Sequence, residues 1–170
     1  MPSSPGLGAA DALQAAKEGR VKAMLVVGDS ANFENGKLGD GLAALGALEF
    51  LVVVDTFLSP AAQQASVVLP RATFAEKDGT FTNLERRIQR LTPALKDGNP
   101  ESRPESWVIC ELARRMNAHG FNLSSAGETM DEIAGLVGIY SGVSYQRLDQ
   151  EGGLVFRTRL ESPQPTQVLY

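Results

Sequence analysis

The sequence contains few of the side chains that bind metal ions through sulfur or imidazole nitrogen. Among 170 residues there is one cysteine, Cys110, and one histidine, His119. A single cysteine excludes an intrachain disulfide and any zinc or iron–sulfur site that needs several thiolates from this chain. A single histidine excludes a site with several imidazole ligands. We expect Cys110 to be a buried, inert thiol on an apolar helix, and His119 to be a surface residue near a helix end.

Long apolar runs and an excess of positive charge are also missing. No apolar segment approaches the roughly 20 residues that a membrane-spanning helix needs, and the first residues do not have the basic and apolar regions of a signal peptide. The 16 lysines and arginines are outnumbered by 20 aspartates and glutamates, which gives a net charge of −4. This balance is not typical of a nucleic-acid-binding domain. We therefore expect no nucleic-acid partner and no direct membrane insertion.

The overall composition is typical of a folded domain, since 43% of the residues are hydrophobic and 21% are charged. A chain of this length is expected to form one domain and to bury roughly 70% of its unfolded surface. Residues 1–8 are rich in proline, serine and glycine, and they are predicted to be a flexible N-terminus. Residues 9–145 are predicted to form an α/β domain, and residues 146–170 an irregular C-terminal extension.

Short apolar runs alternate with helix-forming segments over residues 9–70. The runs have no polar alternation, which favours strands buried on both faces of a sheet. The predicted strands are Lys22–Val27, Phe50–Val54 and Val67–Leu69. The predicted helices are Ala9–Glu18, Gly36–Leu48 and Ser59–Ala65, the last with Ser59 as its N-cap. This order indicates the α/β fold class, with a Rossmann-like, mostly parallel sheet flanked by helices.

The sequence becomes more polar after Thr73. Short strands are predicted over residues 80–82 and 87–91, and helices over residues 105–116 and 129–137. Irregular structure is predicted from residue 141 onward.

Polar residues follow the first two predicted strands, and ligands of open parallel sheets bind beyond the carboxyl ends of strands. The candidate residues are Gly28, Asp29, Ser30 and Asn32 after the first strand, and Asp55, Thr56 and Ser59 after the second. An acidic residue there can accept hydrogen bonds from a sugar or a purine, and a helix beginning at Ser59 offers N–H groups to phosphate. Ordinary turn and capping chemistry is the alternative, because the glycine fingerprints of nucleotide-binding loops are absent.

The segment Glu76–Arg87 concentrates polar side chains of both signs. It is compatible with a solvated hairpin that contains local ion pairs, and with a loop folded over a polar ligand. The residues alone leave both alternatives open.

Several segments together resemble a known family. They are Phe50–Ala62, Ala65–Pro70 and Phe74–Arg90, together with Arg103-Pro104 and Trp107. These segments resemble the molybdopterin oxidoreductases, and most of all the formate dehydrogenase α subunit and the G subunit of bacterial NADH–quinone oxidoreductase (complex I). The resemblance extends from about Ala10 to Tyr145.

The resemblance implies a Rossmann-like domain that helps to bind one half of a bis-molybdopterin guanine dinucleotide. It implies that Gly28, Asp29, Ser30 and Asn32 form a cofactor-binding loop, in which Phe33 replaces a family proline. It implies that Asp55 faces the guanine and that Thr56 and Ser59 line the same pocket. It places Glu76, Gly79, Thr80 and Asn83 in a loop near the pterin.

The sequence also departs from the family. Ser66 stands where the family usually has aspartate, which puts a supporting polar contact in doubt. The family's iron–sulfur cysteines and metal-ligating residue are missing from this chain, so we assign it no catalytic residue and no metal ligand. We expect no cofactor in the isolated chain, and no activity with NADH or formate.

We expect this chain to be a structural, non-catalytic part of the G subunit of complex I, an interpretation that Phe33, Ser66 and Phe57–Pro60 favour. The alternative is the domain that holds molybdopterin guanine dinucleotide in a formate dehydrogenase-like molybdoenzyme. The expected partners are other domains or subunits of a respiratory oxidoreductase complex. The expected location is the cytoplasm, including a peripheral position at the inner face of a membrane through partner subunits.

Overall fold

The structure of the chain is a computed structural model, which describes residues 4–28, 40–95 and 98–155. The chain divides into two compact units. The first falls within residues 1–71 and 101–105, and the second within residues 72–100 and 106–170. Each unit has its own cluster of buried hydrophobic residues.

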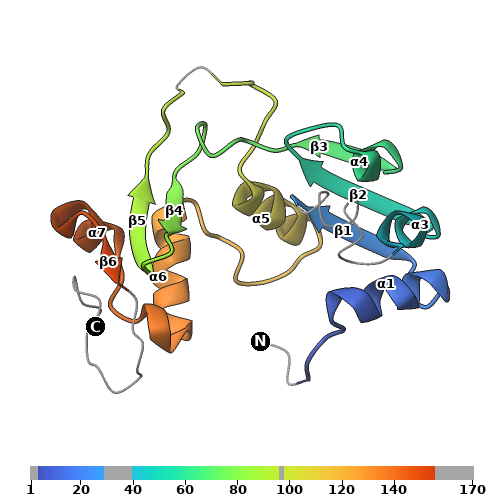
Figure 1. Cartoon of the computed structure of the whole chain (residues 1–170), viewed down its shortest axis with the longest axis horizontal. Coiled ribbons are helices and arrows are strands. Elements are labelled where there is room, and N and C mark those ends of the chain that lie inside the picture. The colour runs from blue at the N-terminus through green and yellow to red at the C-terminus, as the bar shows by residue number, and fades with distance from the viewer. Residues whose placement is uncertain (1–3, 29–39, 96–97, 156–170) are drawn as a thin grey trace. The chain divides into compact units, whose positions relative to one another are not determined.

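A three-stranded parallel sheet organises the first unit (Figure 1). Its strands are β1 (Ala23–Val27), β2 (Phe50–Asp55) and β3 (Val67–Pro70), and they lie in the order β1-β2-β3. Val26 is paired with Val53, and Val53 with Val68. The predicted α/β class, with a parallel sheet flanked by helices, is confirmed.

Three helices accompany this sheet, namely α1 (Ala9–Lys17), α3 (Gly41–Gly46) and α4 (Pro60–Gln63). The predicted start of α4 is confirmed, because the Ser59 hydroxyl accepts a hydrogen bond from the Ala62 N–H and Pro60 occupies the first turn. Part of the segment predicted as the second helix, residues 36–39, lies outside the described residues.

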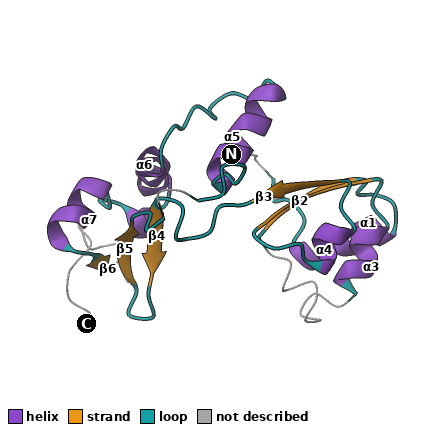
Figure 2. Ribbon diagram, turned by 90° about the horizontal axis from the view of Figure 1, so that it is seen from above, coloured by secondary structure: helices purple, strands orange, loops and turns teal. Residues whose placement is uncertain are grey.

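The core of the first unit lies between these helices and one face of the sheet (Figure 2). Leu45 of α3 and Leu51 and Val53 of β2 are buried there. The opposite face is partly open, since Leu25 is 37% exposed and Phe50 is 48% exposed. We expected β1 and β2 to be buried on both faces of the sheet. This is wrong for Leu25 of β1 and Phe50 of β2, because α1, α3 and α4 all cover the face opposite to these two residues.

An antiparallel sheet organises the second unit. The strands β4 (Gly79–Thr82) and β5 (Arg87–Leu91) form a hairpin, and β6 (Leu154–Val155) pairs with the other edge of β5. The helical elements are α5 (Glu105–Arg115), α6 (Ala126–Leu136), η1 (Gly138–Tyr140) and α7 (Tyr145–Glu151). Only the first residue of α5 belongs to the first unit. The buried cluster contains Ile88, Met130, Val143, Leu148 and Leu154.

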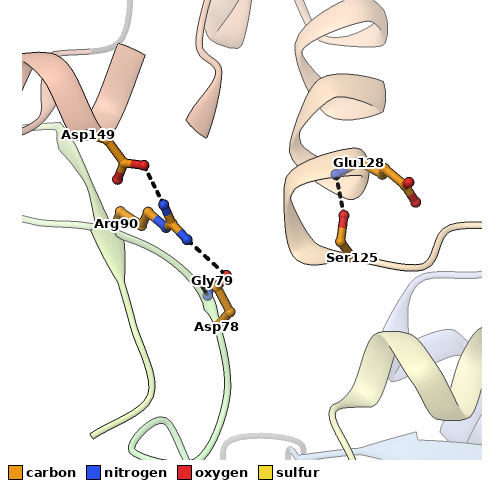
Figure 3. Close-up of polar contacts among 6 residues, drawn as sticks. All are labelled: Asp78, Gly79, Arg90, Ser125, Glu128 and Asp149. Atoms are coloured by element: carbon orange, nitrogen blue, oxygen red, sulfur yellow. Dashed lines mark hydrogen bonds and ion pairs between the residues drawn. The ribbon is translucent and has the colours of Figure 1, made fainter. Parts of the chain in front are cut away.

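The N-terminus of α6 carries a reciprocal capping arrangement, and Figure 3 shows the half of it that joins Ser125 to Glu128. The Ser125 hydroxyl accepts the Glu128 N–H at 3.1 Å, and the Glu128 carboxylate accepts the Ser124 N–H at 2.6 Å. The hydrogen bonds that the Glu128 carboxylate accepts from the N–H and the hydroxyl of Ser124 hold the pKa of Glu128 below its usual range. The sequence S-S-A-G-E therefore contains a capping signal, and the helix begins three residues before its predicted start at Thr129.

Regular structure also forms within residues 146–170. The helix α7 begins after Ser144, whose hydroxyl accepts the Arg147 N–H, and it ends at Gly152, which has φ of +68°. Leu154 then pairs with Ile88. Residues 156–170 lie outside the described residues, and the predicted boundaries at 8 and 145 remain predictions.

Across the described parts of the chain, every helix is too short or too polar to cross a membrane.

Replacing Ile88 by alanine should destabilise the second unit by about 2–5 kcal/mol, because Ile88 is fully buried among residues of four other elements or loops. Leu84→Ala is the matched control on the same hairpin, because Leu84 is fully exposed and its loss should cost less than about 0.5 kcal/mol. Urea unfolding of both variants measures this difference. Equal midpoints would contradict the assigned core.

Candidate functional site

The carboxyl ends of three parallel strands lie side by side in the first unit. Gly28 follows β1, Asp55 ends β2 and Arg71 follows β3. Two backbone hydrogen bonds connect these ends directly. The Gly28 N–H donates to the Val54 carbonyl at 2.9 Å, and the Arg71 N–H donates to the Asp55 carbonyl at 3.0 Å. We call the positions Gly28, Asp55 and Arg71 the strand-end edge.

The Asp55 carboxylate is held in one orientation by its own loop. One oxygen accepts the Thr56 N–H at 2.7 Å, and the other lies 3.4 Å from the Ser59 hydroxyl, which donates to it. The Ser59 oxygen in turn accepts the Ala62 N–H at 3.2 Å. The structure thus brings together Asp55, Thr56 and Ser59, as the sequence predicts, and it shows the turn and capping chemistry that was the alternative explanation for them.

Gly28 is required by two local features. Its φ is +64°, a left-handed conformation that favours glycine. A Cβ atom at this position would also overlap Nη1 of Arg71. The other predicted residues of this loop, Asp29, Ser30 and Asn32, lie outside the described residues, as does Phe33.

Arg71 is a charged residue of the strand-end edge that the sequence analysis did not select. Its Nε lies 2.9 Å from a carboxylate oxygen of Glu105, the first residue of α5. This nitrogen is buried, and among the described residues no acceptor is aligned with its N–H. The backbone of Arg71 is also bridged to that of Arg103, whose N–H donates to the Pro70 carbonyl at 3.1 Å. The sequence feature that could have identified Arg71 is a basic residue directly after the third strand.

Ser66 makes a polar contact despite its departure from the family pattern. Its hydroxyl accepts the Leu51 N–H at 3.1 Å, and its own N–H donates to the Leu51 carbonyl at 2.8 Å. Serine therefore fixes the start of β3 against β2 at this position.

The second predicted group of site residues lies in the second unit, where Glu76 forms a clasp between two backbone segments. Its carboxylate accepts the Thr73 N–H at 2.8 Å and the Asn99 N–H at 3.0 Å. The hydrogen bond from Thr73, followed by that from Asn99, lowers the pKa of Glu76. Both carboxylate oxygens of Glu76 are thus engaged by the backbone of the chain itself.

The remaining members of this group belong to the β4–β5 hairpin. Gly79 and Thr80 are half-buried in β4. Asn83 closes the hairpin turn, since its side-chain oxygen accepts the Arg87 N–H at 2.9 Å and its N–H donates to the Arg87 carbonyl at 3.0 Å. The turn is completed by Arg86, which has φ of +62°. The segment therefore forms a hairpin, and its contact with a ligand stays a prediction.

Arg90 connects the start of this hairpin with α7 (Figure 3). Asp78 accepts the Gly79 N–H at 2.9 Å with one oxygen and lies 3.3 Å from Nη2 of Arg90 with the other. Nη1 of Arg90 donates to Asp149, and the guanidinium lies 4.7 Å from the centroid of the Tyr145 ring. The bond to Asp78 raises the pKa of Arg90, and burial raises that of Tyr145. The sequence analysis did not select Arg90.

The two residues with metal-binding side chains lie outside these groups. Cys110 is buried in α5, as predicted. His119 is exposed in the turn after that helix. No cluster of histidine, cysteine and acidic residues suited to a metal ion occurs in the part of the chain that the structure describes.

The family model for molybdopterin oxidoreductase matches residues 1–115. This chain belongs to the molybdopterin oxidoreductase family. The match includes the segments Phe50–Ala62, Ala65–Pro70 and Phe74–Arg90, on which the resemblance was based.

Three relatives show where in the family the similarity lies. YrhE of Bacillus subtilis (strain 168), named as a candidate formate dehydrogenase, is 41% identical over 145 residues, which cover 85% of this chain and 15% of YrhE. The "Probable oxidoreductase YjgC" of the same strain is 35% identical over 183 aligned positions, covering 100% of this chain and 18% of YjgC. The "F420-dependent formate dehydrogenase 2 subunit alpha" of Methanococcus maripaludis is 40% identical over 148 residues, covering 86% of this chain and 22% of that subunit.

This member of the family therefore spans less than a quarter of the length of each of these relatives. The molybdopterin oxidoreductase family implies a molybdopterin cofactor in the full-length context.

Lowering the pH should expose the role of Glu76. Because its pKa in the folded chain is lower than in the unfolded chain, its contribution to stability is present above the unfolded value of about 4.3 and is lost as the pH falls through the folded value. Glu76→Gln should lower stability at pH 7 and weaken the loss on acidification. Thermal unfolding between pH 7 and pH 3 measures both effects.

Glu85→Gln is the control for Glu76→Gln, because Glu85 accepts a long, exposed hydrogen bond of 3.5 Å from the Asn83 side chain and belongs to the same segment. Identical pH profiles for the unmodified chain and Glu76→Gln would show that the clasp does not form.

Replacing Arg90 by methionine should loosen the start of β4, because Asp78 would lose its cationic partner while keeping its bond to Gly79. Amide hydrogen exchange at Gly79–Thr82 should accelerate, and Asp149→Asn should give part of the same effect. Arg115→Met is the control, since Arg115 lies at the exposed end of α5 and pairs with Glu111. Unchanged exchange in both test variants would mean that Arg90 does not order the hairpin.

Proposed function

We propose that this chain is part of the cofactor-holding region of a formate dehydrogenase-like molybdoenzyme. In this proposal the strand-end edge binds the guanine portion of molybdopterin guanine dinucleotide. The observation that carries it is the Asp55 carboxylate, half-buried at the end of β2 and fixed by Thr56 and Ser59, in a chain whose relatives include a formate dehydrogenase subunit.

The chemistry of Asp55 suits a guanine. Each carboxylate oxygen can accept more than one hydrogen bond, so the contacts with Thr56 and Ser59 leave capacity for the adjacent N1–H and N2–H groups of the purine. Because the carboxylate is already oriented, little side-chain entropy is lost when the ligand binds. The neighbouring Gly28 has no side chain, which leaves room for the guanidinium of Arg71 beside it.

The hairpin residues belong to the second unit and have a separate role in the proposal. Glu76 and Asn83 maintain the shape of the loop, since their side chains bind its backbone. Gly79 and Thr80 follow the turn that Asp78 and Arg90 hold, and we assign the contact with the pterin to them.

The residues of this chain bind and orient the cofactor in this proposal, and none of them is assigned a catalytic role. When bound, the molybdenum cofactor supplies the redox chemistry of the enzyme. The partners proposed are the other domains of a longer polypeptide and other oxidoreductase subunits, because the Methanococcus maripaludis relative is named as a subunit.

The names of YrhE and of the Methanococcus maripaludis subunit favour this proposal over the G subunit of complex I that the sequence analysis preferred. The coding sequence that flanks this chain distinguishes the two. An upstream residue that ligates molybdenum supports the formate dehydrogenase-like enzyme. A [2Fe–2S] ferredoxin-like region without such a residue supports complex I.

Asp55→Ala should abolish the binding of guanine nucleotides to the chain. A charge-assisted pair of hydrogen bonds is worth about 1.5–3 kcal/mol, so weak binding of GMP or GDP should fall below detection by isothermal titration calorimetry.

Asp40→Ala is the matched control for this titration. Asp40 precedes α3 in the same unit, its side chain is exposed, and it pairs with Lys17 at 3.3 Å. Equal affinities for Asp55→Ala and Asp40→Ala would remove Asp55 from the site.

A further inference from the structure

We infer that Arg71 binds the phosphate groups of the nucleotide at the strand-end edge. This inference rests on the proposed function and adds a residue and a ligand group to it. It depends on where the guanidinium lies and on which of its N–H groups the chain uses.

The side chain of Arg71 extends along the edge of the sheet. Neighbouring strands are about 4.8 Å apart, so the ends of β3 and β1 are separated by roughly 10 Å. Arg71 begins beyond the end of β3, and its Nη1 lies against Gly28 beyond the end of β1. The side chain of Arg71 therefore spans the end of β2, where Asp55 is located, and its guanidinium lies beside Gly28.

One side of the guanidinium is held by a carboxylate. Glu105 approaches Nε at 2.9 Å, and the Arg71 side chain keeps 26% of its surface exposed. Within residues 4–28, 40–95 and 98–155, the buried Nε of Arg71 has no aligned hydrogen-bond acceptor. The pair with Glu105 engages Nε and restricts the position of the arginine, and the inference assigns its Nη donors to the ligand.

The shape of a guanidinium suits a phosphate group, which offers two oxygens, better than an anion that is contacted at a single point. Its planar fork of N–H donors matches two oxygens of a phosphate group, and charge-assisted bonds of this kind are stronger than neutral ones. Asp55 supplies an acceptor for a purine N–H edge on the same row of strand ends. A ligand with both an N–H edge and phosphate oxygens satisfies the two residues together, whereas a nucleoside satisfies only Asp55.

Titration calorimetry of the full 170-residue chain with guanosine, GDP and inorganic pyrophosphate tests this inference. GDP should bind more tightly than guanosine. Arg71→Met should weaken GDP binding by about tenfold and leave guanosine binding unchanged. Arg71→Lys keeps the charge but not the fork, so an intermediate loss is expected. Arg20→Met is the control, because Arg20 is an exposed arginine of the same unit that pairs with Glu18.

Each outcome of the titration decides a separate point. Equal GDP affinity in the unmodified chain and in both Arg71 variants would overturn the inference, and the pair with Glu105 would then be structural only. Arg71-dependent pyrophosphate binding without any guanosine binding would support the inference while overturning the guanine placement. If none of the three probes binds, both proposals are overturned. Circular dichroism verifies folding, and Arg71→Lys decides the question if Arg71→Met does not fold.

Discussion

Parallel pairing of β1, β2 and β3 is the constraint on which the strand-end edge depends. Since the strands run in the same direction and in chain order, their carboxyl ends meet at one side of the sheet. The backbone bonds from Gly28 to Val54 and from Arg71 to Asp55 fix the relative positions of these ends. A register shift of one residue would turn Asp55 to the opposite face of the sheet and separate it from its neighbours.

Two arginines with carboxylate partners have comparable roles in the two units. Arg71 is held by Glu105 beside the end of β1. Arg90 joins Asp78 to Asp149, a residue 59 positions later in the chain. Each arginine lies beside a group that the family resemblance connects with the cofactor. Both arginine side chains are half-buried, and these ion pairs fix the positions of the strand ends and of the hairpin.

Local sequence signals predicted most of the secondary structure, for reasons that particular residues make clear. Ser59 and Pro60 predicted the start of α4, because helix capping depends only on residues that are adjacent in the sequence. The apolar runs predicted β1 and β2, because buried parallel strands consist of such runs. The helix α7 was missed because it is short, and it is stabilised by packing of Leu148 against Ile88 and Leu154, which are distant in the sequence.

The sequence by itself determined the α/β class, the family resemblance and the grouping of Asp55, Thr56 and Ser59, because these depend on periodicity, motifs and near neighbours. Tertiary structure alone decided that Arg71 reaches Gly28 and that Arg90 connects Asp78 with Asp149. It also decided that Glu76 binds the backbone of Asn99. A long side chain can contact any element within its reach. Its actual partner is decided only when strands and loops far apart in the chain come together.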